Sequence, residues 1–239
     1  MLKNLFISFL FLFIIISVNS QTTIGEKELY KWFDTTIGHE NTGLIDGLEY
    51  HDIYKTRNGN HKFYLSSSYQ IGNISYNGQR YFDVEMKYDI LDDQIIIKIP
   101  TQTKSYIIQL IKEKIDSFSI KDSKFISIDN LTNHNDGFYE VIYKSSNLAF
   151  YKKNIKTSYK HYSGRSIVYS FKNKDEYLLY FKSKYYKSKK SKNFLIKLLP
   201  KYIKNINLFY KSQSELLNTN YAFFMKKLMT ELNNTISKQ

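Results

Sequence analysis

Apolar and polar side chains alternate with a period of two along most of the chain, from about residue 48 to residue 186. Residues 81–90 show this pattern best, because one face is apolar and the other is mostly charged. The apolar face holds Phe82, Val84, Met86, Tyr88 and Ile90. Since successive side chains of a strand point to opposite faces, the pattern predicts an antiparallel strand with one side on a core. It places Tyr81 on the side that meets water.

Turn signals separate several segments of this kind. Asn58-Gly59 and Asn77-Gly78 are typical of tight hairpins, because both central residues of a type I′ turn have positive φ. Further turns are expected at 92–93, 136–137, 145–147 and 173–175, and further strands at 95–99, 106–112, 125–128, 138–143, 148–159, 167–171 and 177–181. The sequence predicts an α+β, mostly antiparallel fold, with about nine to eleven strands in an up-and-down meander that curls into an open or closed barrel.

The period becomes helical at both ends of this region. Glu26–Ile37 repeats apolar residues at helical spacing and is followed by Gly38, which predicts a short helix with Trp32 packed in the core. Apolar residues from Leu195 onward predict a C-terminal helical pair over about 193–234, with Pro200 kinking or splitting its first member. Residues 212–215 fit a capping box that opens the second member. Residues 21–239 are expected to form one domain.

The first twenty residues have the composition of a secretory signal peptide. Lys3 is followed by an apolar run over 5–16 and by small residues, so cleavage is predicted before Gln21. A retained membrane anchor is the alternative, but the run is short for a bilayer span. We therefore expect an exported protein, periplasmic or extracellular, with no transmembrane span after cleavage. The absence of cysteine excludes disulfides, thiolate-bound metals and a thiol nucleophile, and with the Lys-rich composition it favours a bacterial source.

Charge is distributed unevenly along the chain. Residues 21–140 hold 13 Lys and Arg against 18 Asp and Glu, whereas residues 141–239 hold 21 against 4. Six lysines within eleven residues, with two tyrosines among them, form the candidate binding site. They are Lys182, Lys184, Lys187, Lys189, Lys190 and Lys192, with Tyr185 and Tyr186. Clustered ammonium groups attract anionic surfaces and tyrosine suits a lipid headgroup boundary. The candidate partners are anionic lipid, lipopolysaccharide or an acidic polymer; export argues against nucleic acid. The alternative is an ordinary solvated face.

Motifs for catalysis are weak. The five histidines lack zinc-protease spacing, and the chain has neither a Gly-x-Ser-x-Gly elbow nor a phosphate-binding glycine loop. Asp83 and Glu85 share a predicted strand face, as paired carboxylates do in glycosidases, but alternation with Lys87 favours surface ion pairs. Oxygen-bearing residues at 129–137 resemble a calcium loop faintly and favour a turn. We therefore predict no catalytic residue, no metal and no cofactor.

The chain resembles uncharacterised exported proteins common in Bacteroidetes. The segments that carry the resemblance are 43–50 (GLIDGLEY), 76–81 (YNGQRY), 84–89 (VEMKYD), 137–141 (GFYEV) and the lysine-rich turn into the terminal helices. The resemblance implies a β-rich envelope protein and assigns no activity. The leading hypothesis is a non-enzymatic envelope binding or accessory protein whose basic C-terminal region contacts an anionic surface. The alternatives are a lipocalin-like carrier of an apolar ligand and a hydrolase of envelope polymers.

Overall fold

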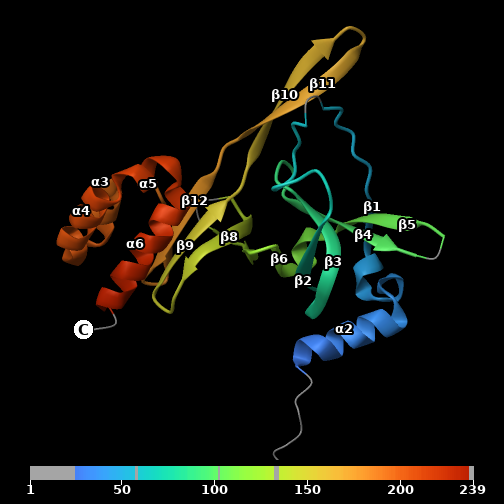
Figure 1. Cartoon of the computed structure of the whole chain (residues 1–239), viewed down its shortest axis with the longest axis horizontal. Coiled ribbons are helices and arrows are strands. Elements are labelled where there is room, and N and C mark those ends of the chain that lie inside the picture. The colour runs from blue at the N-terminus through green and yellow to red at the C-terminus, as the bar shows by residue number, and fades with distance from the viewer. Residues whose placement is uncertain (1–24, 57–58, 102, 132–134, 237–239) are drawn as a thin grey trace, which may run out of the picture.

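The computed structural model describes residues 25–56, 59–101, 103–131 and 135–236 (Figure 1). The predicted signal peptide lies outside the described residues. The helices are α2 (Glu26–Ile37), α3 (Lys192–Leu198), α4 (Ile203–Ser212), α5 (Ser214–Thr219) and α6 (Tyr221–Ile236). The strands are β1 (Gly47–Glu49), β2 (Gln70–Tyr76), β3 (Gln79–Asp89), β4 (Gln94–Pro100), β5 (Ser105–Leu110), β6 (Ile115–Ile120), β7 (Ser123–Ile128), β8 (Gly137–Lys144), β9 (Leu148–Lys153), β10 (Lys156–Ser163), β11 (Ser166–Asn173), β12 (Glu176–Phe181) and β13 (Lys184–Lys187).

Eleven strands form one antiparallel sheet. Their order is β1-β5-β4-β3-β2-β6-β7-β8-β9-β12-β13, and β10 and β11 pair separately. The mostly antiparallel meander with an N-terminal helix and C-terminal helices is therefore confirmed. Because β1 and β13 are both edge strands, the sheet is not closed, and the open form of the predicted barrel is the one that holds. None of the helices in the described part of the chain has the length and apolar character needed to cross a bilayer.

The N-terminal part of the sheet is strongly curled. Leu110 ends β5 and Ile115 begins β6, although β4, β3 and β2 lie between these strands in the sheet. Four strand spacings in a flat sheet amount to about 19 Å, whereas five residue steps span at most about 18 Å even when fully extended. The connection also contains a 3-10 turn, Lys112–Lys114, which shortens its reach. The sheet must therefore bend so that β5 and β6 approach each other.

Aromatic side chains fill the inside of this curl. The rings of Phe118 and Phe125 stack with centroids 4.5 Å apart, and Tyr88 contacts both of them edge-on. Phe138 from β8 completes the group, and all four residues are buried. Because side chains occupy this interior, it gives the carrier hypothesis no support.

A bulge in β3 corrects the predicted strand faces. Gly72 pairs with Val84 and Ile74 with Tyr81, so Phe82 and Asp83 together oppose the single residue Asn73. The extra residue reverses the alternation. As a result Tyr81 is buried in the core, while Phe82 lies on the outer face, the reverse of the prediction.

Helix α2 has the predicted bounds, but its orientation is the reverse of the prediction. Gly38 ends it with φ +77°, a conformation that glycine adopts without strain. Trp32 is not a core residue: its exposed fraction is 64 %, and Leu29 and Phe33 beside it are exposed as well. The side chain that α2 buries is Asp34, whose pKa burial raises. An ion pair between Lys31 and Asp83, 2.9 Å long, holds the helix at the β3 bulge.

The strand predicted at 148–159 is wrong, because it is two strands. β9 belongs to the main sheet, whereas β10 pairs with β11 as a hairpin that projects from the molecule, hereafter the arm (Figure 1). The base of the arm is anchored by the segment near residue 60, where the Phe171 backbone N–H donates to Asn60 Oδ1 at 2.5 Å. The Tyr54 ring packs edge-on against Tyr169 and Phe171. The Asn58-Gly59 turn lies partly outside the described residues.

Four helices, rather than a pair, close the chain. The break at Pro200 is confirmed, since a 3-10 turn over Pro200–Tyr202 separates α3 from α4. The predicted capping box is absent, because the Ser212 hydroxyl donates to the carbonyl of Phe209 at the end of α4. Asn220 splits the rest into α5 and α6, and its Oδ1 accepts from the Phe223 backbone N–H at 3.1 Å. That side chain acts as a helix cap.

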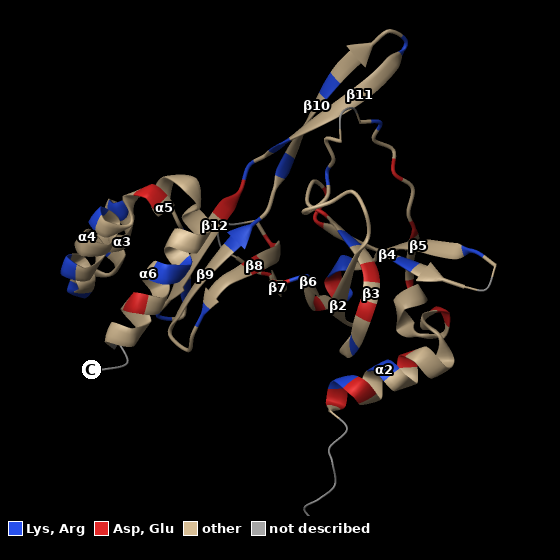
Figure 2. Cartoon of the chain, viewed as in Figure 1, with Lys and Arg blue, Asp and Glu red and all other residues tan. Residues whose placement is uncertain are grey.

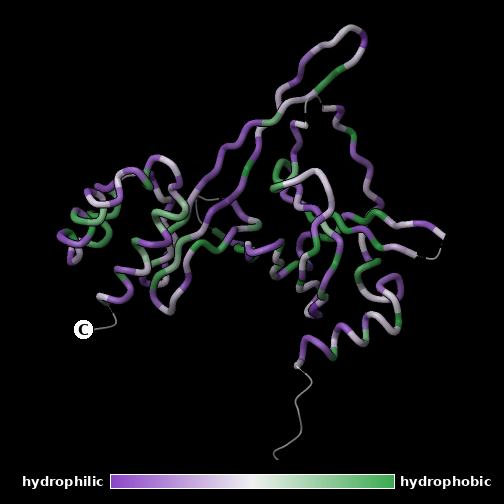
Figure 3. Tube along the Cα trace, in the orientation of Figure 1, coloured by the Kyte–Doolittle hydropathy of each residue, from purple (hydrophilic) through white to green (hydrophobic). Residues whose placement is uncertain are grey.

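These helices cover one face of β8, β9 and β12 and form a second core. Leu195, Phe224 and Leu228 are buried against Leu148 and Phe150. Along this part of the chain, hydrophobic and hydrophilic residues alternate in the helices and in the strands beneath them (Figure 3). The molecule therefore has two cores, one inside the curled sheet and one under the helices.

A partly buried carboxylate joins the strands of both halves. Asp93 Oδ2, in the β3–β4 turn, lies 2.7 Å from Lys112 Nζ and 3.0 Å from Lys153 Nζ. Its Oδ1 accepts a 2.6 Å hydrogen bond from the fully buried Tyr88. Burial would raise the pKa of Asp93, but the two ammonium groups outweigh it and hold that pKa below its ordinary value. Gly137 lies so close that an added Cβ would stand 1.9 Å from Asp93 Oδ2.

Candidate anionic-binding surface

The predicted lysine segment begins at the tight turn between β12 and β13. Its two central residues, Lys182 and Ser183, both have positive φ, 49° and 59°. Positive φ at both central residues is the conformation of a type I′ turn, which suits a two-residue hairpin. The turn lines a hollow of about 310 Å³. The hollow is lined by Ser146, Asn147, Tyr180, Phe181, Lys182, Ser183 and Tyr202.

The structure divides the predicted lysines instead of gathering them. Lys187 forms a 2.9 Å ion pair with Glu176, so its charge is partly compensated. Lys190 lies over the rings of Tyr177 and Tyr221, 5.5 and 5.3 Å from their centroids. Burial raises the pKa of Tyr177 to about 12, so this phenol stays neutral and the contact is a cation–π interaction.

The remaining lysines of the segment are more accessible to an anion than Lys187 and Lys190 are. Lys182 lies over the Phe181 ring at the turn, 5.5 Å from its centroid. Lys184, Lys189 and Lys192 have exposed side chains. These four side chains are therefore the part of the segment that can meet an anion from solution.

The two tyrosines of the segment occupy opposite faces of the sheet. Tyr185 pairs with Tyr180 in the register of β12 and β13, whereas Tyr186 pairs with Leu179 on the face that the helices cover. Tyr185 also packs on the Tyr180 ring, with centroids 5.0 Å apart, and burial raises its pKa. Both tyrosines are half-buried, so they support the sheet and do not form a joint aromatic edge.

The C-terminal helices carry exposed cations that were not among the predicted site residues. Lys204 and Lys211 on α4, and Lys226 and Lys227 on α6, have exposed side chains. The helices also expose large apolar residues, with exposed fractions of 68 % for Leu208 and 45 % for Phe223. The helical period could have predicted that these lysines are exposed, because they lie outside the predicted apolar face of their helices. The sequence did not predict that Leu208 and Phe223 are exposed; this is seen only in the structure.

The arm is a second group of cations that sequence analysis missed. Residues 156–173 contain four Lys and Arg and no acid. Tyr162 and Ile167 pair across the arm near its tip, and both are exposed. Figure 2 shows Lys and Arg spread over the arm and the C-terminal helices, whereas Asp and Glu gather on α2 and β3. The run of cations was a signal in the sequence, but the wrong single strand at 148–159 concealed the hairpin.

The weaker sequence motifs behave as ordinary structural features. Asp83 pairs with Lys31, and Glu85 pairs with Lys98 at 3.3 Å, so both carboxylates form surface ion pairs. Asp136 accepts the backbone N–H groups of Asn130 and Leu131, so hydrogen bonds join the described ends of this loop, while residues 132–134 lie outside the described residues. His134 lies outside the described residues. Within the described ranges, no three His, Asp or Glu side chains gather as a metal site would require.

Comparison with protein-family models, curated proteins and solved structures finds no match to this chain. The function must therefore be argued from the geometry and charge of the molecule itself.

Proposed function

We propose that this is an exported, non-enzymatic binding or accessory protein whose basic C-terminal region contacts an anionic surface. Of the partners considered, a bilayer of anionic phospholipid fits best. The observation that carries this proposal is the combination on α4 and α6 of exposed lysines with exposed Leu208 and Phe223. An acidic polymer or lipopolysaccharide would use the charges without requiring the apolar side chains.

The electrostatic part of the proposal rests on uncompensated charge. Among the described residues, the lysines of α3, α4 and α6 make no ion pair, and the helices carry only Glu215 and Glu231 as acids. Each cation near an anionic bilayer contributes about 1 kcal/mol, and salt screens this attraction. A few exposed apolar side chains add burial in the headgroup boundary.

The test is co-sedimentation of residues 21–239 with vesicles of phosphatidylglycerol and of phosphatidylcholine, at low and high salt. We expect pelleting with the anionic vesicles only, weakened by salt. Reversal of Lys204, Lys211 and Lys227 to Glu should weaken binding by more than about tenfold. Reversal of Lys184, Lys189 and Lys192 to Glu measures how much the predicted lysine segment contributes to vesicle binding.

A matched control reverses three exposed lysines of the N-terminal half, Lys55, Lys104 and Lys121, to Glu. This variant carries the same net charge as the helical variant. If the two variants bind equally well, binding follows total charge and the proposed surface is wrong. If Leu208→Ser and Phe223→Ser leave vesicle binding unchanged while the charge reversals abolish it, the apolar side chains take no part in binding, and the preference for a bilayer over an anionic polymer is overturned.

Export is a separate part of the proposal, supported by the composition of residues 1–20. Intact mass measurement of the protein recovered from the cell envelope or medium should give a chain that begins at Gln21. Recovery of the uncleaved chain in the membrane fraction would favour the retained anchor.

A further inference from the structure

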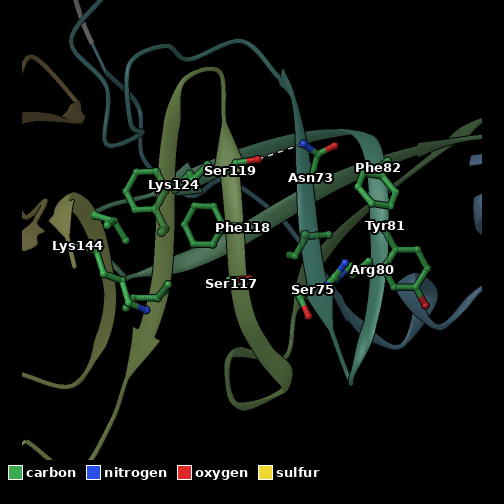
Figure 4. A pocket seen from close by; sticks show the side chains of 14 residues that line it. Asn73, Ser75, Arg80, Tyr81, Phe82, Ser117, Phe118, Ser119, Lys124 and Lys144 are labelled. Carbon is green, nitrogen blue, oxygen red and sulfur yellow. Dashed lines mark hydrogen bonds between the residues drawn. The ribbon is translucent and has the colours of Figure 1, made fainter. Parts of the chain in front are cut away.

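The outer face of the sheet carries a groove, which at β8 lies on the face opposite the one that the C-terminal helices cover. It crosses β3, β2, β6, β7 and β8 and has a volume of about 490 Å³, within the range of sites for small ligands (Figure 4). Arg80 and Phe82 lie on one side in the figure, and Lys124 and Lys144 on the other.

Two rows of cross-strand neighbours form the floor of the groove. One row runs through Arg80, Ser75, Ser117 and Ile126, and the other runs through Asn73, Ser119 and Lys124. Directly opposed residues of antiparallel strands point to the same face. Small polar side chains therefore occupy the middle of the groove, and long cationic side chains stand at opposite ends of the two rows.

The sheet is irregular at this groove. Register shifts occur beside Asn73 in β2, between Ser75 and Tyr76, and between Val141 and Tyr143. Each shift adjoins a residue that lines the groove. Bulges bend a strand and redirect its side chains, and they are frequent beside binding sites. The shifts therefore account for the hollowing of a face that would otherwise be regular.

The serines on the floor keep the groove open. Strands favour Thr, Val and Tyr at half-buried positions of this kind, and those side chains would fill the space. Ser75, Ser117 and Ser119 instead present hydroxyl groups beside the amide of Asn73, which donates to Ser119 Oγ at 3.2 Å. Hydroxyl and amide groups in a shallow trough match the donors and acceptors of a sugar.

The charged groups around the groove favour an anion. Lys124 and Lys144 make no ion pair with the described residues, and Arg80 forms an exposed pair with Glu26 at 3.2 Å. Two acids adjoin the floor: Asp116 accepts from Ser75 Oγ at 3.1 Å, and the Asp83 backbone N–H donates to Asn73 Oδ1 at 3.2 Å. Among groove-lining residues the charged side chains are all cationic.

We propose that this groove binds an acidic saccharide, a short sugar chain that carries carboxylate groups. The serine and Asn73 side chains would bond its hydroxyls, and Arg80, Lys124 and Lys144 would pair with its carboxylates. Phe82 and Val141 provide apolar surface for the C–H faces of the sugar rings. This site is separate from the vesicle-binding surface, so either proposal can fail without the other.

The test is isothermal titration of the exported chain with trigalacturonate, with neutral maltotriose and citrate as comparison ligands. We expect binding of trigalacturonate only. Ser117→Tyr places a strand-favouring side chain in the trough, so it should fold normally and weaken binding more than tenfold. Lys124→Gln should weaken binding several-fold, while Lys104→Gln, an exposed lysine outside the groove, should leave it unchanged.

The proposal is overturned if trigalacturonate gives no binding heat at millimolar concentration, or if Ser117→Tyr binds it as the unaltered chain does. Equal binding of maltotriose would remove the requirement for acid groups, and equal binding of citrate would leave a simple anion site. If Ser117→Tyr fails to fold by circular dichroism, Lys124→Gln combined with Lys144→Gln decides the same question.

Discussion

At the scale of single residues, Asp93 is a side chain on which contacts from several strands converge. It accepts from Tyr88 in the first core and pairs with Lys112 and Lys153, and its Oδ2 also accepts from the Phe138 backbone N–H. Removing one partner of a buried ion pair leaves uncompensated charge and costs far more than removing an exposed pair. Asp93 therefore stabilises the junction between β3–β4 and β8–β9.

We predict that Asp93→Asn lowers the free energy of unfolding by about 3 kcal/mol, because Lys153 remains buried without its carboxylate. Asp83→Asn is a matched control: Asp83 also has positive φ and an ion pair with a lysine, but it is exposed. The control should cost at most about 1 kcal/mol. Urea denaturation followed by circular dichroism measures both, and equal losses would contradict the assigned role.

The Asp93 carboxylate makes the stability of the fold depend on pH, and the sign of this dependence follows from its lowered pKa. A carboxylate with a depressed pKa in the folded state stabilises the protein above its unfolded value, about 3.9. That stabilisation is lost as the pH falls through the folded pKa. The difference in stability between the unaltered chain and Asp93→Asn should therefore narrow below about pH 4. A constant difference down to pH 2 would show that the fold does not lower the pKa of Asp93.

At the scale of elements, helix α2 shows what a periodic pattern can and cannot predict. Its apolar spacing and the following glycine gave correct bounds, because these depend on local propensity and on φ. The face that packs depends on tertiary partners. Here Lys31 pairs with Asp83 at the β3 bulge and Tyr30 contacts the Phe82 ring, while Leu29, Trp32 and Phe33 point outward. Nothing in the sequence of the helix signals that bulge.

The orientation of α2 gives a simple prediction. Because Trp32 is exposed, Trp32→Ala should change the free energy of unfolding by no more than about 0.5 kcal/mol, whereas Leu195→Ala, in the second core, should cost about 2–5 kcal/mol. The fluorescence of this single tryptophan should also be quenched readily by acrylamide. A protected indole, or a large loss of stability in Trp32→Ala, would show that α2 buries its apolar face.

Strand elements were predictable where alternation and turn residues agree. Asn77-Gly78 joins β2 to β3 with positive φ at both residues, as predicted. The division of residues 148–159 into β9 and β10 was not predictable, because Asn154 and Ile155 interrupt no pattern. The available lysines of the candidate site were identified by composition, while the ion pair of Lys187 and the cation–π contact of Lys190 depend on strands that meet only in the fold.

At the scale of the whole molecule, one sheet runs through two hydrophobic cores. The strand order was not predictable from the sequence, because β5 and β6 are neighbours along the chain but are separated by three strands in the sheet. Strand β8 contributes Phe138 to the first core and contacts the second through Ile142 and Tyr143. The Asp93 cluster adds a polar connection beside the same strand. Continuous hydrogen bonding and shared side chains couple the stability of the two cores.

We therefore predict a single cooperative unfolding transition, as the expectation of one domain requires. Phe118→Ala in the first core and Phe224→Ala in the second should each lower the free energy of unfolding by about 3–5 kcal/mol. Both variants should shift the whole transition, measured by circular dichroism for all strands and helices and by Trp32 fluorescence for α2. If Phe224→Ala shifts only the circular dichroism signal and leaves the Trp32 transition in place, the helical half unfolds independently, and β8 does not couple the two cores.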